Sequence, residues 1–447
     1  MTKKLFGTDG IRGRANTYPL TPDMTTKIGM AIGTVLKRKG HKNNIVIGKD
    51  TRLSCYMLEN AICAGLNSVG IDVLLLGPIP TPGLAMITKT MNNDIGIMIS
   101  ASHNPYYDNG IKLFDTNGIK FPDKIEEEIE KCIEEEAYLK ELVIDDKIGR
   151  RQVSENALYQ QRYIQYIKCS SRTVEIDFKI GLDTANGASY KVAPIIFSEL
   201  GAKIFQIGNT PNGININEKC GSTDTKQLTQ LVIDNGCDIG IAVDGDADRC
   251  ILIDENGNEI DGDKIIALIT KDYLERGKLK GNAVVTTQMS NYGFEEYINS
   301  LGLNLIRTKV GDRYVAEEMR KNGYNVGGEQ SGHIILGDYS TTGDGIMTAL
   351  NVLTIMKEKG LKASQISNLY QTTPQILKNV EAKTEILENK ELKELITFYE
   401  KQLEGNGRLL IRKSGTQPLI RVMAEGNNEK SINEIVDKII DKISDLS

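Results

Sequence analysis

Three aspartates alternate along one short segment and could bind a metal ion. Asp244, Asp246 and Asp248 lie at the end of the apolar run 238–244 and just after it. Alternate carboxylates at the end of such a run can converge on one hard cation, and oxygen ligands of this kind suit Mg²⁺ or Ca²⁺. Without a cation, three carboxylates this close would repel one another strongly. The spacing therefore favours a metal site over a solvated turn.

The same aspartates also allow two other kinds of site. The segment partly matches an EF-hand loop, but Arg249 stands where that loop needs glycine, and the flanking residues are typical of strands rather than helices. We therefore reject an EF-hand. Asp244 could alternatively be the nucleophile of an aspartyl-phosphate phosphatase, because it directly follows its predicted strand. The local residues leave that alternative open.

A serine follows a second apolar run and could carry a phosphoryl group. A predicted strand ends at Ser100 and the chain then turns through Asn104-Pro105, which places Ser102 on a loop at the carboxyl end of that strand. A serine in such a place can act as a nucleophile or phosphoryl carrier if a base is near. The flanks do not match G-x-S-x-G, which disfavours a serine hydrolase. A turn with capping serines is the alternative, and possible donors around the hydroxyl are His103, Asn104 and Lys112.

Two further loops could bind a phosphorylated sugar. The glycine-rich loop 327–333 offers an acceptor, a hydroxyl and a titratable ring, in Glu329, Ser331 and His333. The loop 412–421 is either an exposed hairpin turn or a phosphate site, because it gathers the cationic, hydroxyl and backbone donors that a phosphate dianion needs. Together the four loops predict phosphoryl transfer on a phosphosugar. The donors of the last loop are Arg412, Ser414, Gly415, Thr416 and Arg421.

The composition excludes several classes of protein. The chain has 447 residues, and 54 Lys and Arg against 60 Asp and Glu give a net charge of −6, so a nucleic-acid partner is not expected. Only three histidines are present, which favours oxygen ligands for any metal. The seven cysteines form no CxxC pair and are typical of free thiols in a reducing compartment. No secretory signal and no membrane-spanning run is apparent, so we expect a cytoplasmic protein without a membrane partner.

The elements that must position these loops alternate between strands and helices. Short apolar runs bounded by turn residues are typical of buried strands, and amphipathic stretches between them predict helices. This alternation indicates an α/β fold with mixed or mostly parallel sheets, in which the carboxyl ends of strands open onto the ligand crevice. The predicted strands are 44–50, 94–100, 179–183, 238–244 and 282–287, and the predicted helices include 22–37, 56–69 and 226–235.

The length suggests about three domains, whereas the pattern of elements suggests four. Polar segments near 145–152, 255–257 and 371–374 are plausible boundaries. After the last of these, the pattern changes to strand, helix, strand hairpin and helix, and the final helix has an apolar stripe that should pack on a sheet. The predicted domains carry the serine, metal, sugar and phosphate loops in turn, at 1–152, 153–256, 257–372 and 373–447.

Five ordered motifs resemble those of the α-D-phosphohexomutases. They are 7–13, the serine loop, the aspartate loop, 328–333 and 412–416, and they span nearly the whole chain. The resemblance implies three related mixed α/β domains and a smaller C-terminal α+β domain around a central cleft. The form of 101–105 and 109–112 is most similar to the branch that acts on glucosamine phosphate.

The resemblance also implies a reaction. It is the interconversion of glucosamine 6-phosphate and glucosamine 1-phosphate through a phosphoserine enzyme, feeding UDP-N-acetylglucosamine and peptidoglycan synthesis. Glucosamine 1,6-bisphosphate would be both intermediate and activator. A mutase for glucose or mannose phosphates, a metal-dependent phosphatase using Asp244 and a non-catalytic sugar-phosphate sensor are the alternatives. A homodimer is a further expectation from the family.

The family likeness assigns roles to individual residues. Ser102 would be the phosphoserine, and one of its phosphate oxygens would join Asp244, Asp246 and Asp248 around one Mg²⁺ per subunit. Two departures from the usual motifs, Gln417 and Ala247, leave these assignments unchanged. Sugar hydroxyls would be read by Glu329 and Ser331, the non-reacting phosphate by Arg412, Ser414, Gly415, Thr416 and Arg421, and the reacting oxygens would face Arg12, Lys112 and His333.

Overall fold

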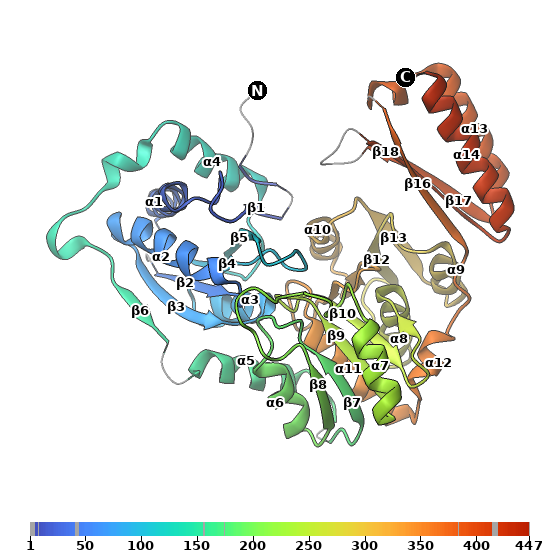
Figure 1. Cartoon of the computed structure of the whole chain (residues 1–447), viewed down its shortest axis with the longest axis horizontal. Helices are drawn as coiled ribbons and strands as arrows, with labels where there is room; N and C mark the ends of the chain where they lie inside the picture. Colours follow the sequence, from blue (N-terminus) through green and yellow to red (C-terminus); the bar gives the residue numbers. More distant parts are fainter. Residues whose placement is uncertain are drawn as a thin grey trace.

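The computed structural model describes residues 5–7, 9–40, 44–154, 157–173, 175–382, 384–413 and 419–446. These residues form four β-sheets that follow one another along the chain (Figure 1). Each sheet with the helices that cover it is called a domain below. None of the described helices has the length and apolar character needed to cross a membrane.

The first domain is a six-stranded mixed sheet with helices on both faces. Alternate side chains of a strand point to opposite faces, so Ile45 and Ile47 pack under α1 and α2, whereas Val46 packs against α3. The strand order is β1-β5-β4-β2-β3-β6, with β1 and β5 antiparallel to their neighbours. The elements are β1 (Ile11–Arg14), α1 (Pro22–Arg38), β2 (Asn44–Lys49), α2 (Leu53–Ser68), β3 (Asp72–Pro78), α3 (Thr81–Thr90), β4 (Ile95–Ile99), β5 (Asp108–Asp115), α4 (Asp123–Glu134), η1 (Ala137–Glu141), η2 (Asp145–Lys147) and β6 (Arg151–Val153).

The second domain is a five-stranded mixed sheet of order β11-β10-β9-β7-β8. β7 runs parallel to β8 and β9, and the hairpin partners β10 and β11 are antiparallel. Strands β9 and β10 flank the aspartate loop, which agrees with the rejection of an EF-hand. The elements are α5 (Leu158–Cys169), β7 (Lys179–Asp183), α6 (Val192–Glu199), β8 (Lys203–Ile207), α7 (Lys226–Asn235), β9 (Ile239–Val243), β10 (Cys250–Asp254) and β11 (Glu259–Ile260).

The third domain is a four-stranded sheet of order β13-β12-β14-β15 that shares one hydrophobic core with the second. Helix α11 packs against α8 of its own domain and also against α5 and β10 of the second. The elements are α8 (Gly262–Glu275), β12 (Ala283–Thr287), α9 (Tyr292–Ser300), β13 (Asn304–Thr308), α10 (Asp312–Asn322), β14 (Val326–Gly328), β15 (Ile334–Leu336), α11 (Gly345–Lys359) and α12 (Ala363–Ser367).

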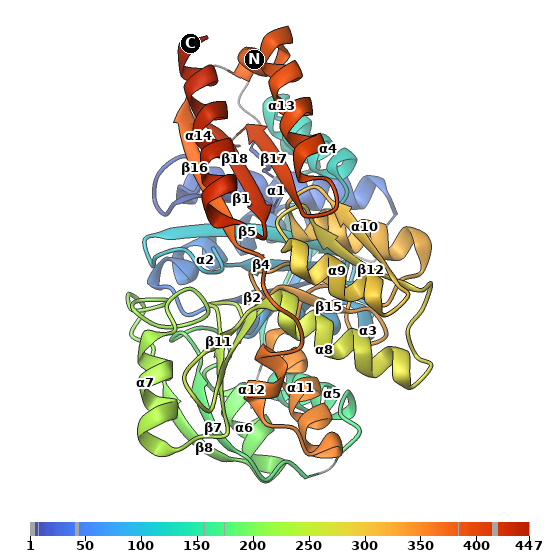
Figure 2. The ribbon, with the colours of Figure 1, turned by 90° about the vertical axis from the view of Figure 1, so that its right-hand side faces the viewer.

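The fourth domain is a three-stranded antiparallel sheet of order β16-β18-β17. It projects from the third domain at one corner of the molecule (Figures 1 and 2). The predicted apolar stripe of the last helix is buried against the sheet from Ile432 to Ile443. The elements are β16 (Gln375–Glu381), η3 (Thr384–Glu388), α13 (Lys390–Leu403), β17 (Gly407–Lys413), β18 (Leu419–Gly426) and α14 (Glu429–Asp445).

The predicted fold class, three mixed α/β domains and a smaller α+β domain, is confirmed. The domain limits at 152, 256 and 372 stay predictions.

Candidate active site

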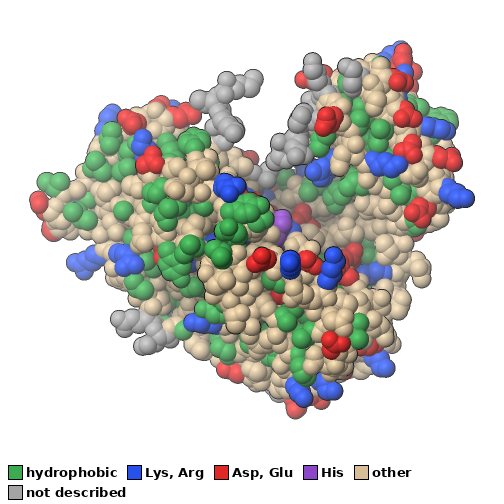
Figure 3. All heavy atoms as spheres, viewed as in Figure 1, with side chains coloured by type: hydrophobic (Ala, Val, Ile, Leu, Met, Phe, Trp, Pro, Cys, Tyr) green, Lys and Arg blue, Asp and Glu red, His purple; other side chains and the backbone are tan. Residues whose placement is uncertain are grey.

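Polar loops from three sheets meet in one cleft. The Ser102 loop follows β4, the aspartate loop follows β9, and 329–333 joins β14 to β15. Two adjoining cavities of about 630 and 730 Å³ lie there, and both are lined by His103, Arg249 and Glu329. Figure 3 shows the hollow between the first and fourth domains, with a histidine at its floor. The cleft therefore gathers the loops that the sequence singled out.

The hydroxyl of Ser102 points at the aspartate loop of the second domain. It donates a hydrogen bond to Oδ2 of Asp244 at 2.6 Å, and Nδ1 of His103 lies 3.3 Å from Oγ. The residue is buried and has a φ of 53°. This left-handed backbone costs a non-glycine residue about 1–2 kcal/mol. The surrounding contacts must therefore hold the loop in place.

A buried arginine holds the serine loop from below. Nη2 of Arg52 donates to the carbonyl oxygens of Ser102 and Asn104, and Nε donates to Asp50 at 2.8 Å. The Ser102 carbonyl also accepts from Asn217 Nδ2 of the second domain, at 2.9 Å. These bonds occupy both lone pairs of that carbonyl, and they hold the backbone of the serine loop in place.

The three aspartates are fully buried and close together. One carboxylate oxygen of each lies within 4.8 Å of the others. Asp246 Oδ2 accepts from Lys112 and Thr81, whereas Oδ1 of Asp246 and Oδ1 of Asp248 accept no hydrogen bond from the described residues. Unpartnered buried acceptors are costly. Their presence in a carboxylate cluster is what a cation site would need.

The pKa of Asp244 also indicates a cation site. Burial first, and then the charges of Asp248 and Asp246, raise its pKa well above the ordinary value. At Asp244, burial and the two neighbouring carboxylates therefore outweigh the nearby charge of Arg249. Oxygen ligands of this number and type fit Mg²⁺.

Lys112 and Arg12 supply cations next to the aspartates. Nζ of Lys112 lies 2.9 Å from Asp246, 3.4 Å from Asp9 and 3.7 Å from Asp248. Burial alone would lower the pKa of Lys112, but these carboxylates raise it. Arg12 forms an ion pair with Asp9 and lines the cleft. Arg12 therefore places a cation on the wall of the cavity that Ser102 also lines, while Lys112 is held among the buried carboxylates.

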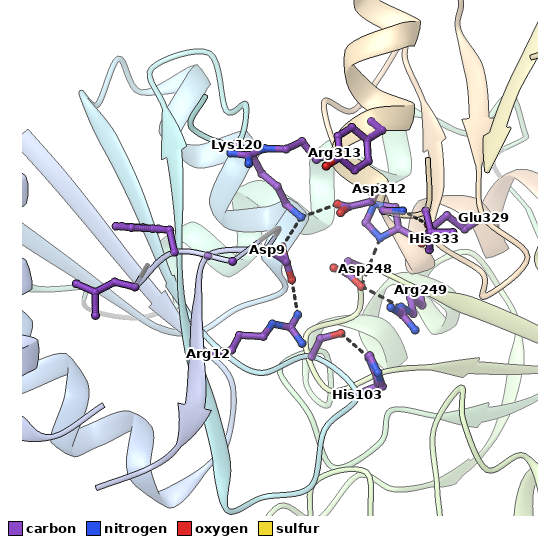
Figure 4. Close-up of a pocket in the computed structure, with 18 residues that line it drawn as sticks. Asp9, Arg12, His103, Lys120, Asp248, Arg249, Asp312, Arg313, Glu329 and His333 are labelled. Carbon is purple, nitrogen blue, oxygen red and sulfur yellow. Dashed lines mark hydrogen bonds and ion pairs between the residues drawn. The ribbon is translucent and has the colours of Figure 1, made fainter. Parts of the chain in front are cut away.

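His333 lies between two carboxylates from different domains (Figure 4). Nδ1 is 3.6 Å from Asp248 and Nε2 is 3.4 Å from Asp312, and Asp312 also pairs with Lys120 at 2.5 Å. Lys120 in turn pairs with Asp9 of the first domain at 2.5 Å. Together with Lys112, these groups close a ring of alternating charges, which spans three domains.

This setting suits His333 in both protonation states. Burial lowers its pKa, but Asp312 and Asp248 outweigh burial and raise the pKa to about 9. The N–H of Gly343 lies 3.0 Å from Nε2 and can donate to it when the ring is neutral. A ring stabilised as imidazolium by carboxylates and as imidazole by a backbone donor can move a proton.

Glu329, Ser331 and Arg421, from the predicted sugar and phosphate loops, line the larger cavity. Glu329 Oε1 accepts from the N–H of Gly311, and Ser331 is an exposed residue on the cavity wall. Arg421 lines the same cavity and pairs in register with Arg412 across β17 and β18. Burial and the charge of Arg421 lower the pKa of Arg412. The remaining predicted phosphate ligands, Ser414, Gly415 and Thr416, lie outside the described residues, as does Gln417.

The structure adds residues that the sequence reasoning did not assign. Asp9 belongs to the motif 7–13, and Arg52 follows a predicted strand, so both carried a signal that could have been used. No sequence signal identified Lys120, Asp312 or Thr81, because each meets its partners only in the folded chain. All five contact the predicted site residues or their partners.

Four family models match the chain in order. They are the phosphoglucomutase/phosphomannomutase α/β/α domains I, II and III, at 3–140, 159–257 and 261–373, and the C-terminal domain at 377–442. The chain belongs to the phosphoglucomutase/phosphomannomutase family and is an isomerase of the phosphohexomutase class.

Within this family the chain resembles the phosphoglucosamine mutases along its whole length. It is 50% identical to the phosphoglucosamine mutase of Rhizobium johnstonii over 452 residues and to that of Brucella ovis over 450 residues. Each match covers 100% of this chain and 99% of the relative. The family and enzyme class expected from the motifs are thereby confirmed.

Solved structures share the fold at lower identity. A phosphoglucomutase/phosphomannomutase family protein from Burkholderia thailandensis superposes with a TM-score of 0.82 at 20% identity, covering 97% of this chain and 95% of that one. An Aspergillus fumigatus N-acetylphosphoglucosamine mutase in complex with GlcNAc-6P and magnesium gives a TM-score of 0.62 at 19% identity, covering 99% and 95%. These likenesses establish the four-domain architecture.

Proposed function

We propose that this chain interconverts glucosamine 6-phosphate and glucosamine 1-phosphate through a phosphoserine at position 102 and a glucosamine 1,6-bisphosphate intermediate. The contact that carries the proposal is the 2.6 Å hydrogen bond from the Ser102 hydroxyl to Asp244 within a buried carboxylate cluster. The full-length phosphoglucosamine mutase relatives support the choice of sugar. The product would feed UDP-N-acetylglucosamine and peptidoglycan synthesis in the cytoplasm.

Mg²⁺ is the proposed cofactor, one per chain. Asp244, Asp246 and Asp248 would hold it together with an oxygen of phosphorylated Ser102. Bound there, the ion would neutralise charge on the phosphoryl group that is transferred. The Aspergillus relative, solved with magnesium and a phosphosugar, supports this ion.

The cationic side chains then act on the reacting phosphate. A sugar hydroxyl attacks phosphorus, the bond from phosphorus to Oγ of Ser102 breaks, and the hydroxyl proton passes to a base in the cleft. Arg12 and Lys112 stabilise the charge that spreads over the phosphoryl oxygens. His333 takes an acid–base or charge-stabilising role, because its ring faces the same cleft.

The outer loops hold the rest of the substrate. Glu329 and Ser331 read sugar hydroxyls, while Arg412, Arg421 and the loop between them hold the non-reacting phosphate. The bisphosphate must turn round before it returns a phosphate to Ser102, so this clamp must accept either phosphate. The two adjoining cavities provide the space for that turn. A closed cleft would keep the intermediate from water.

Comparing substrates tests the choice of sugar. We expect kcat/KM to be highest for glucosamine 6-phosphate, against glucose and mannose 6-phosphates, with Mg²⁺ and each matching bisphosphate present. A preference for glucose phosphate would overturn the substrate assignment while leaving the phosphoserine chemistry intact. Sedimentation of the same sample would test the expected homodimer.

Two variants separate the mutase from a phosphatase that uses Asp244. Ser102→Ala should abolish phosphosugar conversion, while Ser198→Ala, at an exposed helical serine, should leave it unchanged. Release of inorganic phosphate that survives Ser102→Ala and is lost in Asp244→Asn would favour the phosphatase instead.

A further inference from the structure

Thr81 makes two hydrogen bonds to one aspartate of the cluster, 165 residues away. It is the first residue of α3 and is fully buried. Its backbone N–H donates to the carbonyl oxygen of Asp246 at 2.9 Å, and its hydroxyl donates to Oδ2 of Asp246 at 2.6 Å. The first N–H groups of a helix have no partner within the helix. The backbone bond therefore satisfies α3, whereas the hydroxyl bond acts on the carboxylate alone.

The two carboxylate oxygens of Asp246 differ in their hydrogen-bond partners. Oδ2 accepts from Thr81 and from Lys112, so its lone pairs are occupied. Oδ1 is buried and accepts no hydrogen bond from any described residue. Without the Thr81 bond, Lys112 would be the remaining donor to this carboxylate, and nothing else among the described contacts would fix its rotation. The unpartnered oxygen Oδ1 would then no longer be held in one orientation.

A second hydroxyl from the first domain makes the matching contact. Ser102 donates to Asp244 at 2.6 Å, as Thr81 does to Asp246. Two of the three cluster carboxylates are thus oriented by hydroxyls that belong to another domain. These two hydroxyl contacts form only when the first and second domains are docked.

We infer that Thr81 is a positioning residue for the divalent cation, which it serves by holding Asp246 so that Oδ1 is presented to the ion. The inference rests on the proposed metal site. Partners of this kind behind a ligating carboxylate typically contribute 10- to 100-fold to metal affinity. The role requires the hydroxyl and not merely the shape of the side chain.

Matched substitutions isolate that hydroxyl. Thr81→Val keeps the branched shape and the backbone hydrogen bond but removes the side-chain donor. Thr81→Ser keeps the donor. Thr88→Val removes a buried hydroxyl from the same helix that donates to the Leu84 carbonyl, away from the cluster. Circular dichroism melting of each metal-free variant reports loss of fold separately from loss of metal binding.

Calorimetric titration of the full chain with Mn²⁺, used as the probe, tests the inference. We expect the Mn²⁺ Kd of Thr81→Val to rise about 10- to 100-fold, with Thr81→Ser and Thr88→Val within about threefold of the wild type. Equal Kd values for Thr81→Val and the wild type would overturn the inference but leave the metal site standing. Equal weakening in Thr81→Ser would also overturn it, since shape rather than the hydroxyl would then matter. Failure of the wild type to bind Mn²⁺ would overturn the metal site and the inference together.

Discussion

The junction of the first three domains and the attachment of the fourth are built differently. At the junction, carboxylates and cations from different domains alternate around Ser102, as in the pairs of Lys120 with Asp9 and Asp312. At the attachment, Arg408 of the fourth domain donates to the carbonyl oxygens of Gln288 and Ser290 in the third. The residues around the aspartate cluster are thus held by contacts from several domains, while the fourth domain is attached at one corner.

The buried carboxyl groups of the two regions differ accordingly. At the junction, burial would raise the pKa of Asp9, but Lys112, Lys120 and Arg12 lower it well below its usual value. At the attachment, burial and the charge of Asp261 raise the pKa of Asp263 to about 7. The comparison indicates that burial raises the pKa of a carboxyl group only where too few cations face it.

Replacing Arg52, which supports the Ser102 loop, should cause the largest loss of stability. Arg52→Met leaves the buried carboxylate of Asp50 without its partner and frees the serine loop. We expect the unfolding free energy to fall by about 3–5 kcal/mol. The control Lys168→Met, which removes a partly exposed pair with Glu199, should cost under about 1 kcal/mol.

Urea unfolding followed by circular dichroism measures both variants, because the chain has no tryptophan. Similar losses of stability in the two would contradict the structural role of Arg52.

A smaller effect tests whether the junction charges couple the domains. A double-mutant cycle of Lys120→Met and Asp312→Asn should give a coupling of about 2 kcal/mol in unfolding free energy, because both side chains are largely buried. The same cycle on Lys357 and Asp177, a more exposed pair, should give under about 1 kcal/mol. Equal couplings would mean that the junction is no tighter than the surface.

A third effect concerns the pH dependence of stability at the attachment. Asp263 accepts from the N–H of Asn291, whose side chain donates to the Thr373 carbonyl and to Glu425 of the fourth domain. Its folded pKa of about 7 lies above the unfolded value of about 3.9. Between these values the folded chain keeps a proton that the unfolded chain has released, so stability falls as pH rises.

Asp263→Asn should remove this dependence. The stability of the variant relative to the wild type should therefore increase with pH between about 4 and 7, by up to about 1.4 kcal/mol per pH unit. Parallel pH profiles of urea unfolding would contradict the raised pKa of Asp263.

The features predicted from the sequence are those that local residue patterns determine. The periodic helix 226–235 is α7, and Ser102 and Asp244 meet because both follow strands whose carboxyl ends open onto the cleft. Lys120 and Asp312 pair across 192 residues, and no local spacing records such a contact. The same holds for Thr81, whose neighbouring prolines indicate only a turn.

The proposed reaction depends on Ser102, which would carry the phosphoryl group between positions of one sugar. Peptide mapping by mass spectrometry, after incubation with glucosamine 1,6-bisphosphate and then with glucosamine 6-phosphate, tests it most directly. We expect one phosphate on the peptide that contains Ser102 after the first step, and its transfer to the sugar in the second. An unmodified Ser102 in protein that still converts glucosamine 6-phosphate, or a phosphate on Asp244, would contradict it.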